Sequence, residues 1–127
     1  MASILLIEPD VVLARLYADA LELAGHAVRT AATAQVAIDI ADDARPDVVL
    51  LELQLVMHSG IEFLYEFRSY PEWQSVPVII LSNVPPAEFS ASKTVLAQQL
   101  GVRLYHYKPH TSLQKLLRVV EAATVKV

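Results

Sequence analysis

The stretch PDVVLLELQL, residues 46–55, contains four consecutive aliphatic residues, Val48 to Leu51, followed directly by the acidic residue Glu52. A strand that is apolar on both faces is typical of a parallel sheet that helices cover on both sides. Two other short aliphatic runs have the same character, and two segments of mixed polarity suit the edges of such a sheet. The predicted strands are residues 4–7, 26–30, 48–51, 78–81 and 102–107.

Segments with helical spacing of apolar residues separate these runs. In the first segment Leu13, Leu16 and Tyr17 share one helix face, with Asp10 as the predicted N-cap and Gly25 as the stop. The other predicted helices are residues 36–44, residues 60–70, about residues 87–100, and a final helix that begins after Thr111 or Ser112. Five β-α units predict an α/β fold, a doubly wound five-stranded parallel sheet between two layers of helices.

From length and composition we expect one compact domain over residues 1–127, with no effector domain. Burial of both sheet faces explains why 54% of the residues are hydrophobic. The chain has 10 Lys and Arg residues against 14 Asp and Glu, so it has no basic excess for nucleic-acid binding. The absence of Cys excludes disulfides, thiolate zinc sites and Cys nucleophiles. No apolar run approaches the ~18–20 residues of a membrane-spanning helix, and the N-terminus has no basic leader, so we expect a cytoplasmic protein.

Polar residues follow four of the predicted strands at the point where each strand ends. They are Glu8, Glu52, Ser82 and Lys108. The carboxyl ends of parallel strands meet at one edge of the sheet, which is where sites form in open α/β folds. Two acids, a hydroxyl and an amine are therefore expected to converge on one pocket. The four His residues have no metal-ligand spacing, and no metal site is predicted.

The same residues resemble the response-regulator receiver domains of two-component signalling. The resemblance covers the whole chain and is carried by Glu8-Pro9-Asp10, by residues 46–55 leading to Gly60, by residues 78–82, and by residues 101–109, which end in Lys108-Pro109. It implies a flavodoxin-like (βα)5 fold with strand order 2-1-3-4-5, and a signalling module rather than an enzyme. In the family, an Asp at the end of the third strand accepts a phosphoryl group from a histidine kinase with Mg²⁺ bound. A Thr or Ser and an aromatic residue then shift to signal the change.

The sequence departs from the receiver pattern at positions that carry this chemistry. Glu52 matches the phosphoacceptor Asp, Pro9 matches the second of two metal-binding acids, and Asn83 matches a residue that is usually small. The resemblance also implies a cis peptide bond before the Pro that follows the last strand. Three features of the family pattern remain, namely Ser82, Lys108 and the aromatic Tyr105. Glu8 matches the first of the two acids, and Lys108-Pro109 is the most specific part of the resemblance.

These departures weigh against phosphoryl transfer. Mg²⁺ requires near-octahedral oxygen ligands, but Pro9 supplies no side-chain oxygen and Asp10 is expected to be occupied as a helix cap. We therefore predict weak Mg²⁺ binding or none, and no other cofactor. One extra methylene displaces the acceptor carboxylate by roughly 1 Å, which is enough to cost on the order of 10²-fold in rate. We expect phosphorylation of Glu52 to be absent or very slow.

We hypothesise that a Glu52–Lys108 ion pair fills the pocket and fixes one signalling conformation. Glu8, on the adjacent strand, is expected to lie close enough to repel Glu52.

A receiver without phosphoryl chemistry is expected to act by protein–protein contact. In the family, the fourth helix, fifth strand and fifth helix form the partner surface. The corresponding candidates here are Lys93, Gln98, Tyr105 and residues near Lys115. Candidate partners are a histidine kinase, a downstream signalling protein, or a second copy of the chain in a homodimer. Neither nucleic acid nor a membrane is expected as a partner.

Several alternatives stay open at this point. A purely structural ion pair at the strand ends also explains Glu8, Glu52 and Lys108. A phosphorylatable, Mg²⁺-dependent receiver would use a neighbouring acid, Asp10 or Asp47, although Asp47 begins its strand at the wrong end of the sheet. A small haloacid-dehalogenase-like phosphatase has a similar order of acid, hydroxyl and lysine, but it requires an Asp nucleophile and a further acidic pair. A flavodoxin-like cofactor binder requires a hydroxyl- and Gly-rich phosphate loop, and the acids after the first strand would repel a phosphate there.

Overall fold

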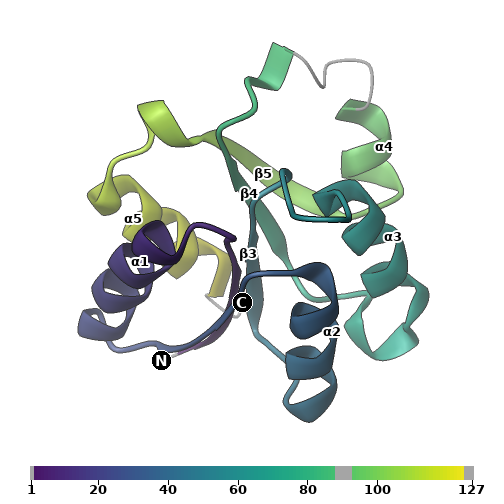
Figure 1. Ribbon diagram of the computed structural model, residues 1–127, viewed down its shortest axis with the longest axis horizontal. Helices are drawn as coiled ribbons and strands as arrows, with labels where there is room; N and C mark the ends of the chain where they lie inside the picture. Colours follow the sequence, from purple (N-terminus) through teal and green to yellow (C-terminus); the bar gives the residue numbers. More distant parts are fainter. Residues whose placement is uncertain (1, 88–92, 125–127) are drawn as a thin grey trace.

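The computed structural model describes residues 2–87 and 93–124, without the side chains of residues 93–95 and 103. Strands and helices alternate along the chain as predicted (Figure 1). The strands are β1 (Ser3–Ile7), β2 (Ala27–Ala31), β3 (Val48–Leu51), β4 (Val78–Ser82) and β5 (Val102–Tyr107). The α-helices are α1 (Val11–Leu23), α2 (Ala34–Asp43), α3 (Gly60–Ser69), α4 (Lys93–Gln98) and α5 (Leu113–Thr124), and two short 3-10 helices are η1 (Pro71–Trp73) and η3 (Lys108–His110).

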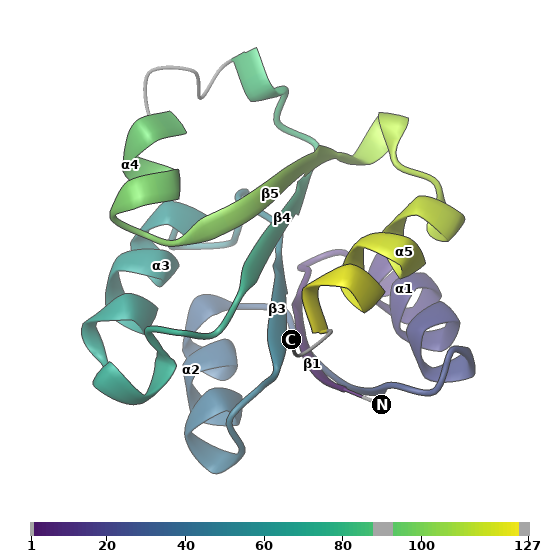
Figure 2. The same cartoon turned by 180° about the vertical axis from the view of Figure 1, so that it is seen from behind.

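The five strands form one parallel sheet in the order β2-β1-β3-β4-β5, which confirms the predicted topology. Figures 1 and 2 show α1 and α5 on one face of the sheet and α2, α3 and α4 on the other. Ile7 pairs with Leu51, and Leu51 pairs with Ile80, so the carboxyl ends of β1, β3 and β4 lie level. The residues that follow these strands therefore meet at one edge of the sheet.

Both faces of the central strands are buried, which is why these strands are aliphatic throughout. Leu50 and Leu51 point to opposite faces of the sheet, and neither has any exposed surface. Leu51 belongs to an apolar layer with side chains of α2 and α3, and Leu50 belongs to a second layer with side chains of α1 and α5. Two apolar layers in so short a chain account for its high hydrophobic content.

The helices α1 and α3, which start near the carboxyl edge of the sheet, each begin at a side-chain N-cap. One carboxylate oxygen of Asp10 accepts hydrogen bonds from the backbone N–H groups of Val12 (2.9 Å) and Leu13 (3.1 Å), so Asp10 is the N-cap of α1, as predicted. At α3, Ser59 and Glu62 form a reciprocal capping box. Both caps fix the direction in which the chain leaves the carboxyl edge of the sheet.

Gly60 allows α3 to start very close to the residues that follow β3. A Cβ atom at this position would lie 2.8 Å from the Cα of Leu53 and 3.0 Å from the carbonyl oxygen of Glu52. Neither backbone atom can move without displacing the end of β3. Only glycine, therefore, fits here, and its small size holds the backbone of Glu52 against the start of α3.

The C-terminal half of the chain differs from the sequence predictions at α4 and at Pro109. The predicted fourth helix, about 87–100, includes residues 88–92, which lie outside the described residues, and α4 covers only Lys93–Gln98. The peptide bond before Pro109 is trans, so the expectation of a cis bond was wrong. Among the described residues no helix combines the length and the apolar character needed to cross a membrane.

Candidate functional site

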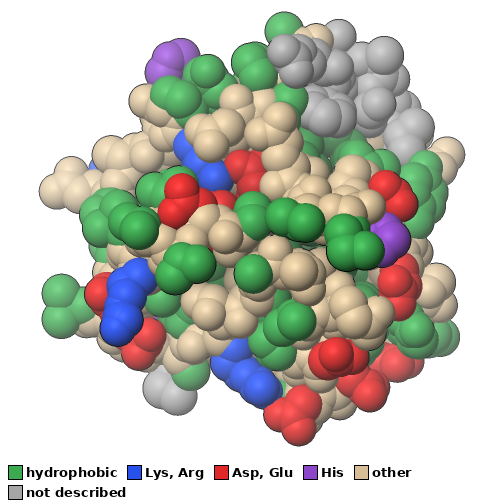
Figure 3. Space-filling view, viewed as in Figure 1, with side chains coloured by type: hydrophobic (Ala, Val, Ile, Leu, Met, Phe, Trp, Pro, Cys, Tyr) green, Lys and Arg blue, Asp and Glu red, His purple; other side chains and the backbone are tan. Residues whose placement is uncertain are grey.

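Four strand ends bring Glu8, Glu52, Ser82 and Lys108 into direct contact at the carboxyl edge of the sheet. On the face of the molecule in Figure 3, Lys or Arg side chains lie against Asp or Glu side chains between the two helix layers. The ionic groups of the pocket are nevertheless almost completely buried. The exposed fraction of the side chain is 6% for Lys108 and 3% for each of the two glutamates. Charges this deep are stable only when they are paired and hydrogen-bonded.

The ammonium group of Lys108 lies between two carboxylates. Its Nζ atom is 2.6 Å from Oε1 of Glu52 and also forms an ion pair with Oε1 of Glu8. The two glutamates, which would repel one another on adjacent strands, share this one cation. Lys108 thereby ties β5 to both β1 and β3.

The carboxylate of Glu52 has a hydrogen-bond donor in every direction. Its Oε1 atom accepts from Lys108 Nζ and from the backbone N–H of Asn83 at 3.2 Å. Its Oε2 atom accepts from the hydroxyl of Ser82 and from the backbone N–H of Gln54 at 3.0 Å. Four donors fill the lone-pair sites of a carboxylate. An incoming anion or metal ion would have to displace at least one of them.

The surroundings of Glu52 and Lys108 favour the charged form of both groups. Burial alone would raise the pKa of Glu52, but the hydrogen bonds from Lys108 and Ser82 outweigh it, and the pKa is lowered from the ordinary value. Burial would likewise lower the pKa of Lys108, but its bonds to Glu52 and Glu8 raise that pKa above the ordinary value. Both shifts keep the ion pair charged across the neutral range.

The lowered pKa of Glu52 predicts that the fold loses stability in acid. A carboxylate whose pKa is lower in the folded state stabilises the fold above its unfolded pKa, and that contribution disappears as the pH falls through the folded pKa. We expect the free energy of unfolding of the wild type to exceed that of Glu52→Gln most at about pH 6, and the difference to shrink below the ordinary Glu pKa of 4.5. Urea unfolding over this pH range measures the difference. Glu66→Gln, on the exposed side of α3, is the control, and parallel pH profiles for wild type and Glu52→Gln would contradict the assignment.

The residues present do not form a Mg²⁺ site. Glu8 and Glu52 are both bonded to the Lys108 ammonium, Pro9 has no side-chain oxygen, and the carboxylate of Asp10 caps α1. Asp10 contributes to the pocket through its backbone N–H, which donates to Glu8 Oε2 at 3.1 Å. Within residues 2–87 and 93–124, no group of three or more His, Cys, Asp or Glu side chains is arranged to hold a metal ion. A divalent cation would have to compete with an ammonium group for the same two carboxylates.

A chain of hydrogen bonds leads from the pocket to Tyr105. The hydroxyl of Ser82 accepts from the backbone N–H of Val84 at 3.1 Å. The carbonyl oxygen of Val84 in turn accepts from the phenol of Tyr105 at 2.6 Å. Glu52, Ser82, the backbone of Val84 and the half-buried Tyr105 are thus linked in one series of contacts.

The remaining predicted residues lie outside the bonded pocket. Pro109 is exposed in η3, and the side chain of Asn83 is exposed although its backbone N–H bonds Glu52. Gln98 on α4 and Lys115 on α5 are exposed, whereas the side chain of Lys93 lies outside the description. Asp47 lies at the opposite end of the sheet, where its carboxylate accepts the backbone N–H of Ser3 at 2.8 Å.

Sequence reasoning missed the part that Tyr17 plays in this pocket. It was predicted to share an apolar helix face with Leu13 and Leu16; Tyr17 is buried, whereas 47% of the Leu16 surface is exposed. Burial raises the pKa of its phenol, Lys108 opposes this effect, and Glu8 and Glu52 add to it. The charges of these three groups thus influence the Tyr17 phenol in addition to its burial.

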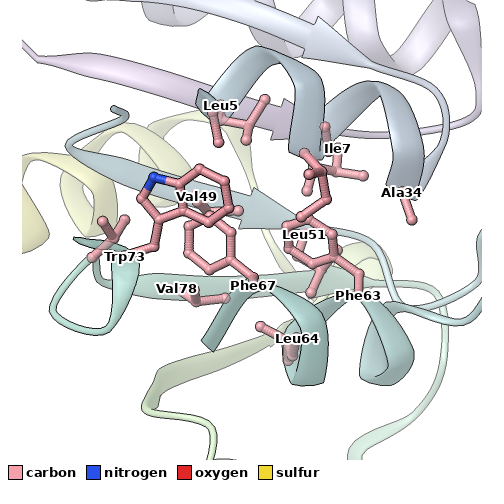
Figure 4. Close-up of a cluster of buried hydrophobic side chains, with 14 of the residues drawn as sticks. Leu5, Ile7, Ala34, Val49, Leu51, Phe63, Leu64, Phe67, Trp73 and Val78 are labelled. Carbon is pink, nitrogen blue, oxygen red and sulfur yellow. The ribbon is translucent and has the colours of Figure 1, made fainter. Parts of the chain in front are cut away.

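Aromatic packing behind β3 supports the pocket from the other side. Figure 4 shows Leu51, the residue before Glu52, among side chains from α3 and from neighbouring strands. Phe67 stacks on Phe63 with ring centroids 5.3 Å apart, and on Trp73 with centroids 5.0 Å apart. This packing fixes the end of β3 and hence the point from which the Glu52 side chain starts.

A doubly wound sheet with acids after β1 and β3, a hydroxyl ending β4 and a lysine after β5 defines a receiver-type α/β domain. The chain belongs to the response regulator receiver domain family, whose sequence model matches residues 4–121. Receiver domains are signalling modules of two-component systems. Membership favours the receiver interpretation over the phosphatase and flavodoxin-like alternatives.

Two relatives illustrate the range of the sequence similarity. The chain is 35% identical over 121 residues to the KDP operon transcriptional regulatory protein KdpE of Escherichia coli (strain K12), which covers 94% of this chain and 51% of that protein. It is 28% identical over 80 residues to the polar-differentiation response regulator DivK of Brucella anthropi, which covers 63% of this chain and 65% of that protein. The chain thus spans about half the length of KdpE.

Solved structures show the same fold. A CheY-like response regulator receiver domain protein from Methanospirillum hungatei superposes with a TM-score of 0.85 at 20% identity, covering 98% of this chain and 94% of that one. The chemotaxis protein CheY4 of Vibrio cholerae superposes with a TM-score of 0.83 at 23% identity, covering 97% and 98% of the two chains. At this level of identity the similarity concerns the fold alone.

Proposed function

We propose that this chain is an atypical receiver domain that does not accept a phosphoryl group and that acts in two-component signalling through protein–protein contact. One observation carries the proposal. The carboxylate of Glu52, at the position of the family's phosphoacceptor, is bonded to Lys108, to Ser82 and to two backbone N–H groups. The pocket is filled from within, by a side chain of the protein itself.

Phosphoryl transfer depends on the position of the nucleophile and on neutralisation of charge in the transition state. The lysine and the hydroxyl that the family resemblance places around an incoming phosphoryl group are here bonded to Glu52. Glu8 and Glu52 with Lys108 leave one net negative charge in the pocket, which repels an anion. The donor set does not fit Mg²⁺, so the charge of a metal ion is not available to offset this repulsion.

The test is labelling with acetyl phosphate in the presence of Mg²⁺, followed by intact mass spectrometry. We expect the wild type to remain unlabelled, because its acceptor is misplaced and its donors are occupied. The matched variant is Glu52→Asp combined with Pro9→Asp, which returns the acceptor and the metal ligand of the family pattern, and we expect it to gain label. Labelling of the wild type that disappears in Glu52→Gln would overturn the proposal.

We further propose that the partner binds the surface formed by α4, β5 and α5, which includes Gln98 and Lys115. The partner would be a histidine kinase, a downstream signalling protein or a second copy of the chain. The absence of Cys suits a reducing compartment, and we place this contact in the cytoplasm. Tyr105 connects this surface to the pocket through Val84.

The contacts between the pocket and Tyr105 determine which variants should be compared for partner binding. Tyr105→Ala removes the bond to Val84, and Glu52→Asp shortens the carboxylate that holds Ser82. We expect both variants to retain less partner than the wild type in a pull-down. Tyr65→Ala, at an exposed position of α3 on a different surface, is the control. Equal retention by all four proteins would favour a pocket with a structural role only.

A further inference from the structure

His26 is a buried titratable residue that the pocket does not use. It lies just before β2, and the exposed fraction of its side chain is 4%. Its Nδ1 atom accepts a hydrogen bond from the backbone N–H of Ala2 at 3.2 Å, in a buried contact that spans 24 positions of the chain. Its Nε2 atom lies 3.4 Å from Oε2 of Glu121 on α5. One imidazole ring thus joins the start of β1, the turn before β2 and the last helix.

These contacts determine which nitrogen carries the proton. Because Nδ1 accepts a hydrogen bond from an N–H group, it has no proton of its own in this arrangement. The proton of the neutral ring must then be on Nε2, where it points toward Glu121. A second proton could go only to Nδ1, and it would face the N–H of Ala2.

We propose that His26 is a proton-sensitive latch that holds the start of β1 and the C-terminal part of α5 together, and that acid opens it. Protonation of Nδ1 replaces an accepted hydrogen bond by two opposed N–H groups, so the backbone of Ala2 is released. Ala27 follows, because its N–H donates to the carbonyl oxygen of Ala2 at 2.9 Å. The latch works at the opposite edge of the sheet from the Glu52 pocket and is independent of the proposed function.

The charged groups around the ring set the direction of the effect. The charged side chains of the elements that pack here are Arg15, Asp19 and Glu22 on α1, Lys115, Arg118 and Glu121 on α5, Arg29 on β2, and Asp47, which binds the neighbouring N–H of Ser3. In the described part of the chain only Glu121 forms an ion pair with the imidazole, and its side chain is 69% exposed. With a protonated ring, the exposed ion pair to Glu121 favours the closed latch over the open one by at most about fivefold. The buried N–H of Ala2, left without an acceptor, favours the open latch by about tenfold or more, so acidification opens the latch.

The first test is a long-range ¹H–¹⁵N NMR spectrum of the histidine rings in the full chain at about pH 7.5. We expect His26 to be the neutral ring with its proton on Nε2. The second test is hydrogen exchange of the Ala2 and Ala27 amides at about pH 7.5 and about pH 5.5, corrected for the intrinsic effect of pH. We expect the corrected rate to rise about twofold or more in acid, because the roughly tenfold effect of the unpaired N–H is offset by the roughly fivefold effect of the Glu121 ion pair.

The matched variant is His26→Asn, whose side-chain oxygen can accept the Ala2 N–H at the position of Nδ1 but cannot titrate. It keeps the other three His residues of the chain, so a difference from the wild type isolates His26. We expect its corrected exchange rates to be the same at both pH values. A proton on Nδ1 in the wild type, or an equal response to acid in wild type and His26→Asn, would overturn the proposal. If His26→Asn does not fold, the position of the proton in the wild type still decides it.

Discussion

Replacement of Lys108 by Met is expected to lower the free energy of unfolding by about 3–5 kcal/mol, because it leaves two buried carboxylates without a cation. The side chains of Glu8 and Glu52 are each 97% removed from solvent, and among the described residues Lys108 is the ammonium group that both of them contact. Methionine keeps most of the volume of the lysine stem, so the loss reports charge rather than a cavity. Urea unfolding at neutral pH measures it.

The matched control removes the charges together. In the triple variant Lys108→Met, Glu8→Gln and Glu52→Gln, no buried carboxylate is left unpaired. We expect this variant to regain at least half of the stability that Lys108→Met loses, since replacing a whole buried ionic group is much less costly than removing one partner. A loss below about 1 kcal/mol in Lys108→Met would mean that water reaches the pocket and that the ion pair behaves as an exposed one.

Phe67→Ala is expected to cost about 3–5 kcal/mol of folding free energy, because it opens a cavity in the layer behind β3. Phe67 has no exposed surface and stacks on both Phe63 and Trp73. The same layer contains Leu51, which precedes Glu52 in the chain. We therefore expect the NMR signals of the pocket to shift as well, in proportion to the displacement of the end of β3.

The control for this substitution lies on the same helix. Tyr65 is also an aromatic residue of α3, but 53% of its surface is exposed, and Tyr65→Ala is expected to cost less than about 1 kcal/mol. Both variants change an aromatic residue to Ala in α3, so the change in helix propensity is similar. The difference between their losses of stability in thermal or urea unfolding therefore measures the effect of burial. Equal losses would show that packing behind β3 does not stabilise the fold in the way the contacts suggest.

The sheet and its site edge were predictable because both depend on simple periodicity. Continuous aliphatic runs such as Val48–Leu51 predict buried parallel strands, and the carboxyl ends of such strands must meet. Asp10 was predictable as a cap because a short acidic side chain before a helical pattern bonds the first N–H groups. These are local properties of the chain.

Contacts between distant segments were not predictable in the same way. The sharing of Lys108 by both glutamates depends on the register of β1, β3 and β5, and the bonds to Asn83 and Gln54 come from backbone N–H groups, which any residue would supply. His26 looked like an edge-strand residue, yet it is buried against α5, because side-chain type does not reveal which distant helix covers a strand end. The bond before Pro109 was expected to be cis by family resemblance alone, and it is trans.

In the proposed function, Glu52 fills the pocket and holds the chain in one conformation. The most direct measurement is a ¹H–¹⁵N NMR spectrum of the wild type before and after addition of beryllofluoride with Mg²⁺, which together imitate a phosphorylated carboxylate. A filled pocket predicts no shift in the signals of Ser82, Tyr105 or the Lys108 ammonium group, and clear shifts in the Glu52→Asp, Pro9→Asp variant. Saturable shifts of these three residues in the wild type would show that the pocket is open to a phosphoryl group and that Glu52 does not fill it.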